Sequence, residues 1–93
     1  MDKPTPALLL AQLRELEVLL QSLTGAHDVK HVNALLMFIA RGAPNPSIRG
    51  LAMLAMAEVN TLRRNLVEQD RRKLDRVLHQ LRAAIEEVEK QAG

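Results

Sequence analysis

Two histidines four residues apart are the first candidates for chemistry in this chain. His27 and His31 flank Asp28, and this spacing places both imidazoles on one side of a helix, as binding of a shared zinc ion requires. A zinc site needs a third protein ligand, and no spacing singles out His79 or an acid for that role. We therefore interpret both histidines as solvated side chains and expect neither a metal nor any other cofactor.

The carboxylates and hydroxyls show no arrangement typical of an active site. General acid–base catalysis needs two acids in contrasting environments facing one cleft, whereas Glu15, Glu17 and the acids within 86–89 lie opposite the apolar sides of their helices. No serine or threonine stands in a nucleophile elbow or beside an apparent base, and the sequence has neither a glycine-rich phosphate loop nor a cysteine. We predict that the protein is not an enzyme and has no small-molecule substrate.

A cluster of basic residues between positions 63 and 76 is the strongest charge feature. Its members are Arg63, Arg64, Arg71, Arg72, Lys73 and Arg76. Such a cluster is typical of phosphate contacts, and we keep a nucleic-acid-associated regulator as the alternative hypothesis. The competing interpretation is internal pairing, because three acid–base pairs have the spacing of intrahelical ion pairs: Arg64–Glu68, Glu68–Arg72 and Arg71–Asp75. The chain also lacks tyrosine and tryptophan on which single-stranded bases could stack.

Two apolar stripes with spacings of three and four mark helices at both ends of the chain. The N-terminal stripe consists of Leu9, Leu13, Leu16, Leu20 and Leu23. The C-terminal stripe consists of Leu74, Leu78, Leu81, Ile85 and Val88. Each stripe needs another helix to cover it. Further leucines flank the N-terminal stripe, so we expect it to pack inside the chain. The C-terminal stripe is narrow and surrounded by charges, and we predict that it contacts a second chain.

Breaks in the apolar pattern divide the chain into four helices within one domain over 1–93. We predict a tail at 1–5, helices at 6–23, 28–41, 48–67 and 70–91, and a proline-rich loop at 42–47. The predicted capping residues are Thr5, Gly25, Asp28, Gly42, Ser47 and Asp70. The last two helices are alternatively one long helix. We favour a break, because a helix of about 45 residues would span roughly 67 Å. The fold class is an all-α bundle with antiparallel packing.

The middle of the chain is predicted to supply much of the core. The helix over 28–41 is apolar almost all round, so we expect it to be the most buried, with Phe38 inside. In the helix over 48–67, we interpret Gly50 as a position where a neighbouring helix approaches closely. Met53 and Met56 supply adaptable bulk beside it, as core or as part of an interface.

Composition and charge favour a protein that binds other proteins. A net charge of +2 is too small to imply nucleic acid or an acidic membrane. Apolar runs such as 34–40 are far shorter than the roughly 20 residues that span a bilayer, and the N-terminus lacks a signal-peptide pattern. We therefore predict a cytoplasmic, bacterial-type adaptor, chaperone or regulator. It would form a homodimer or bind a helical partner through the C-terminal stripe, Met53 and Met56.

Overall fold

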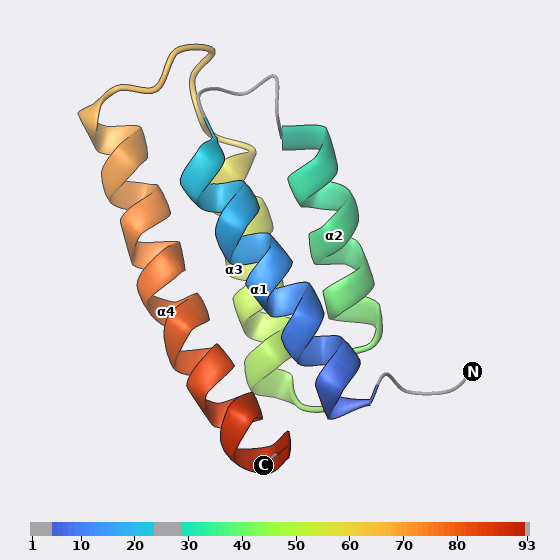
Figure 1. Cartoon of the computed structure of the whole chain (residues 1–93). Coiled ribbons are helices and arrows are strands. Elements are labelled where there is room, and N and C mark those ends of the chain that lie inside the picture. Colours follow the sequence, from blue (N-terminus) through green and yellow to red (C-terminus); the bar gives the residue numbers. More distant parts are fainter. Residues whose placement is uncertain (1–4, 24–28, 93) are drawn as a thin grey trace.

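The computed structural model describes residues 5–23 and 29–92, which form four α-helices. These are α1 (Pro6–Ser22), α2 (Val29–Arg41), α3 (Pro46–Val59) and α4 (Glu68–Ala92). Figure 1 shows successive helices running in alternating directions around a common interior. The prediction of an all-α bundle of four helices is confirmed. The predicted caps Gly25 and Asp28, and His27 of the histidine pair, lie outside the described residues.

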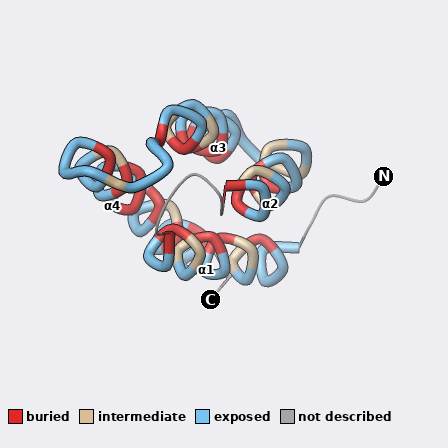
Figure 2. The backbone as a smooth tube through the Cα atoms, turned by 90° about the horizontal axis from the view of Figure 1, so that it is seen from above, coloured by how far each residue is buried: buried red, intermediate tan, exposed pale blue. Residues whose placement is uncertain are grey.

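The core lies where the apolar sides of all four helices meet (Figure 2). Both predicted stripes belong to it. The largest hydrophobic side chains that are fully buried are all aliphatic: Leu13, Leu16, Leu20, Leu36, Ile39 and Leu81. Burial of one such side chain stabilises the fold by about 1.5–3 kcal/mol. The core therefore depends on leucine-rich helix faces and contains no aromatic ring.

Two ion pairs join α1 to α4. Arg14 lies 3.1 Å from Glu89, and Glu17 lies 2.8 Å from Arg82. Because the partner numbers fall along α4 as they rise along α1, these two helices run in opposite directions (Figure 1). Exposed pairs of this kind contribute at most about 1 kcal/mol each, so the leucine stripes beneath them provide most of the attraction between the two helices.

The start of α3 differs from the prediction. Asn45, and not Ser47, is the N-cap: its side-chain oxygen accepts a hydrogen bond of 3.0 Å from the N–H of Ile48. Pro46 then occupies the first helical position, where its missing N–H costs nothing. The predicted left-handed cap at Gly42 is also wrong, because no described glycine has a positive φ.

The end of α3 comes at Val59, well before the predicted end at residue 67. The side chains of Asn60 and Thr61 donate hydrogen bonds of 2.6 and 2.8 Å to carbonyls in the last turn of α3, which satisfies these acceptors without a further turn. Leu62 is buried and Leu66 packs against the core, both from the connection that follows α3. These two leucines continue the apolar spacing of α3 in the sequence, although they follow the end of the helix. The predicted helix was therefore too long.

The longest helix, α4, is separate from α3. It begins at Glu68, and residues 60–67 form the connection, so the alternative of one continuous helix is wrong. Its polar side carries charges of both signs along its length. None of the helices within the described residues is both long enough and apolar enough to cross a membrane.

The small residues of α3 fall into two groups. Ala52 and Ala55 are fully buried, on the side of the helix that faces the core. Gly50 is exposed, and a Cβ atom added there would have no atom within 4 Å. The interpretation of Gly50 as a site of close helix packing is therefore wrong.

Candidate interaction surface

The C-terminal stripe, predicted to contact a second chain, lies in the core of its own chain. Leu81 is fully buried, and the other four members are at most 7% exposed: Leu74, Leu78, Ile85 and Val88. Helix α4 packs on α1 and α3, and these neighbours cover the stripe (Figure 2). A second chain has no access to these side chains in this fold, so a partner surface has to be sought elsewhere.

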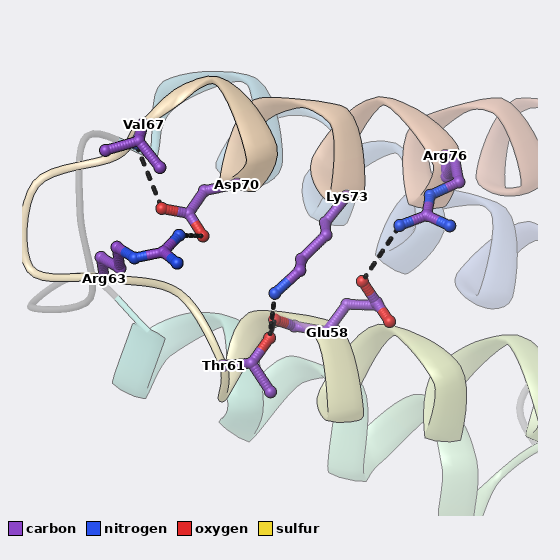
Figure 3. A network of polar contacts seen from close by, with 7 residues as sticks. All are labelled: Glu58, Thr61, Arg63, Val67, Asp70, Lys73 and Arg76. Carbon is purple, nitrogen blue, oxygen red and sulfur yellow. Dashed lines mark hydrogen bonds and ion pairs between the residues drawn. The ribbon is translucent and has the colours of Figure 1, made fainter.

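The basic cluster at 63–76 is largely occupied by contacts within the chain. Four of its six members have such a contact: Arg63 with Asp70 (3.3 Å), Arg72 with Glu68 (3.0 Å), Arg76 with Glu58 (4.0 Å) and Lys73 with the Thr61 hydroxyl (3.1 Å) (Figure 3). The predicted Glu68–Arg72 pair is confirmed. Among the described contacts, the predicted pairs of Arg64 with Glu68 and of Arg71 with Asp75 do not occur. Arg64 and Arg71 are exposed.

Asp70 is the only buried polar or charged residue in the described part of the chain, and it organises the connection into α4. One carboxylate oxygen accepts a hydrogen bond from the N–H of Val67 (3.1 Å), and the other accepts one from the Arg63 guanidinium (3.3 Å; Figure 3). Asp70 is the third residue of α4, so it takes the N3 position and not the predicted N-cap position, and its carboxylate makes the backward contact of a capping box, to the N-cap N–H.

Hydrogen bonding and charge shift the acidity of this carboxylate. The Val67 N–H lowers the pKa of Asp70 below its usual range, burial opposes this shift, and the positive charge of Arg63 lowers the pKa further. A lowered folded-state pKa stabilises the fold at every pH above the ordinary carboxyl value. This stabilisation is lost as the pH falls from that value through the folded-state pKa.

Asp70→Asn is therefore expected to lower the melting temperature by a few degrees at pH 7, because the amide cannot supply the negative charge. The difference from the wild type should stay constant down to about pH 5 and shrink below about pH 4, because Asp70 then binds a proton in the unfolded chain and, only at lower pH, in the folded chain. Thermal melts followed by circular dichroism between pH 7 and pH 3 measure both effects. Asp75→Asn, at an exposed position of the same helix, is the matched control. A difference that does not change with pH would contradict this role of the charge.

Large apolar side chains are exposed on two adjacent helices. We call the set Met37 and Phe38 of α2 with Met53 of α3 the α2–α3 surface. Leu54 is also exposed, but it follows Gly50 and Leu51, which line a hollow together with α4, by four and three residues, so it lies on the α4 side of α3. Phe38, the only aromatic residue of the chain, is 66% exposed, and Met53 is 57% exposed. The two helices pack side by side (Figures 1 and 2). The prediction that Phe38 lies inside is wrong, because Val32, Leu36 and Ile39 already fill the core side of α2.

The other exposed large apolar residues are scattered. Leu8 and Val18 lie on α1, and Val67 lies just before α4. Met56, predicted together with Met53 as core or interface, is partly buried and packs against the core. Of the two methionines, only Met53 therefore contributes to the α2–α3 surface.

An open hollow lies beside this surface at the connection between α2 and α3. It has a volume of about 580 Å³ and is lined by residues 41–46 together with Arg49, Gly50 and Met53. Arg41 and Arg49 therefore border the same depression as a methionine of the α2–α3 surface. Within the described residues, no carboxylate forms an ion pair with either arginine.

The sequence explains why this region carries one sign of charge. Residues 29–57 contain Lys30, Arg41 and Arg49 but no aspartate or glutamate, and all 11 acids of the chain lie outside this stretch. The apolar pattern of the sequence did not reveal the α2–α3 surface, because Met37 and Phe38 extend an apolar run that also fits a buried helix. The absence of acids over 29–57 is the signal that could have located it.

No protein-family model, curated protein or solved structure matches this chain. Among the described residues, no group of three histidines, cysteines or acids is placed to hold a metal ion. The α2–α3 surface is therefore the feature of this chain that bears on its function.

Proposed function

We propose that this protein is a non-enzymatic helical interaction module that binds another protein chain through the α2–α3 surface. The observation that carries the proposal is the exposure of Phe38, the only aromatic ring of the chain. Burial of a phenylalanine side chain contributes about 1.5–3 kcal/mol of stabilisation, and most of this ring is exposed in the fold. Burial of the ring under a partner would stabilise the complex by part of this amount.

The neighbours of Phe38 support the same function. Met37 precedes it on α2, and Met53 adds apolar surface on the adjacent helix. Several large apolar side chains exposed on two packed helices are more typical of a binding site than a single exposed one. Methionine side chains adapt to partners of different shape. The partner is a second copy of this chain or a helical segment of another protein, and the role is that of a cytoplasmic adaptor, chaperone or regulator.

The contacts of the basic cluster give the nucleic-acid alternative less support than binding of another protein. Four of the six cations in the basic cluster already contact groups of their own chain. Phosphate binding would compete with those contacts. The cluster also contains Glu68, Asp70 and Asp75, which weaken its positive field.

A photo-cross-linking amino acid in place of Phe38 tests the proposed function. We expect cross-linked products in living cells, either dimers or adducts with a second protein, whose cross-linked peptide mass spectrometry identifies. The same amino acid in place of Glu15, an exposed position of α1, is the matched control. The products should disappear when Met37 and Met53 are both changed to serine. Equal cross-linking from positions 38 and 15 would contradict the proposal.

A further inference from the structure

The α2–α3 surface combines apolar side chains with positive charge. Arg41 and Arg49 share the hollow that Met53 also lines, and Lys30 is exposed on the first turn of α2. The nearest acid along the chain after this region is Glu58, which lies 4.0 Å from Arg76 of α4 and is thus directed toward that helix. A partner therefore meets cations that no acid of residues 29–57 compensates.

Carboxylates are the groups that complement this surface. Arginine and carboxylate form charge-assisted hydrogen bonds, often in pairs, which fix the orientation of a bound segment. The apolar side chains require an apolar side on the same segment. An amphipathic helix presents both, because residues spaced by three and four form its apolar side and the remaining positions carry charge.

Two other occupants fit less well. A symmetric dimer would place this surface against itself, and because residues 29–57 contain no carboxylate, the same surface of the second copy offers Arg41 and Arg49 no opposite charge. A membrane with anionic lipids is typically bound by clusters of about four to eight basic residues, more than the three cations present in residues 29–57.

We infer that the α2–α3 surface binds an acidic amphipathic helix of another protein. The apolar side of that helix contacts Met37, Phe38 and Met53, and its carboxylates pair with Arg41 and Arg49 at the hollow. This inference rests on the proposed function and adds the chemistry of the partner.

Three synthetic peptides test the inference. They share one leucine-rich apolar side and carry glutamate, glutamine or lysine at all polar positions. Fluorescence anisotropy with the full chain should show binding of the glutamate peptide, about tenfold weaker binding of the glutamine peptide, and no binding of the lysine peptide. The preference for glutamate should decrease between about 50 and 200 mM salt, because salt screens exposed charges.

Variants at exposed positions separate the charged contacts from the apolar ones. The double variant Arg41→Gln, Arg49→Gln should bind the glutamate and glutamine peptides equally, whereas Phe38→Ser should weaken the binding of both. The double variant Arg64→Gln, Arg71→Gln removes the same amount of charge from the basic cluster and should leave binding unchanged. Unaltered circular dichroism melts confirm that each variant is folded.

The possible outcomes distinguish this inference from the proposed function. Equal wild-type binding of the glutamate and glutamine peptides, abolished by Phe38→Ser, would overturn the acidic partner and leave the interaction surface in place. A homodimer in light scattering that Phe38→Ser dissociates would do the same. Binding to vesicles with anionic lipids but to no peptide would overturn the inference in favour of a membrane. If the chain binds no peptide and no vesicle and does not self-associate, both proposals fail.

Discussion

Leu81→Asp is expected to unfold the protein rather than to release a folded monomer. Leu81 is fully buried where α4 packs on the rest of the bundle. Loss of a buried leucine costs about 2–5 kcal/mol, and a carboxylate left without a partner in the core adds several more. A domain of this size is stable by only about 5–15 kcal/mol. Circular dichroism at 25 °C should show loss of most of the helical signal and no cooperative melting transition.

Gln80→Asp is the matched control for this prediction. Residue 80 is exposed, and the substitution introduces the same carboxylate one position away from Leu81. It should keep the helicity and the melting behaviour of the wild type, within about 0.5 kcal/mol of its stability. A Leu81→Asp variant that stays helical and monomeric would mean that the C-terminal stripe lies on the surface. The stripe would then again be a candidate contact for a second chain.

Helical periodicity accounts for what the sequence could predict of the fold. A stripe such as Leu13, Leu16 and Leu20 must be covered, and only a helix aligns these side chains. The number of helices follows from three breaks, which lie at Gly25, at the proline-rich loop and at the polar residues before Leu74. The positions of apolar residues did not locate the end of α3. Leu62 is buried although it lies in the connection after the helix, and its spacing in the sequence is the same as that of a helical core residue.

The same periodicity could not predict which chain covers each stripe. Leu78 and Ile85 show the same spacing whether they face α1 of their own chain or a helix of another chain. Charges on both sides of a narrow stripe are compatible with either arrangement, because long charged side chains also border a buried seam within one chain. The prediction that Phe38 lies inside was wrong for a related reason. A helix with apolar residues on all sides can bury only the side for which the bundle has neighbours.

The role of Asp70 also depends on geometry that the sequence does not contain. Its type and position before an apolar stripe indicated a helix start, which was correct to within two residues. The capping contact runs backward to the N–H of Val67, and the partner of the second carboxylate oxygen, Arg63, comes from the preceding connection. Only the path of residues 60–67 brings that arginine to the start of α4.

Ala55→Leu is expected to destabilise the protein by about 1–3 kcal/mol, because added methylene groups in a filled core force neighbouring side chains out of their preferred rotamers. Ala55 is fully buried on the core side of α3. Urea unfolding followed by circular dichroism should show a lower midpoint with an unchanged slope. Unaltered stability would mean that the core has room beside α3, contrary to the complete burial of Ala55.

Gly50→Ala on the same helix is the matched comparison, and it is expected to change stability in the opposite direction. Alanine at this position would gain about 0.5–1 kcal/mol, because it restricts the unfolded chain and suits a helix better than glycine. The added methyl group meets no atom within 4 Å, and the φ of Gly50 is not positive, so the folded state pays no strain. Both substitutions enlarge a small residue of α3. The opposite signs reflect the filled core around Ala55 and the backbone freedom of glycine at the exposed position 50, and the urea midpoints measure both effects.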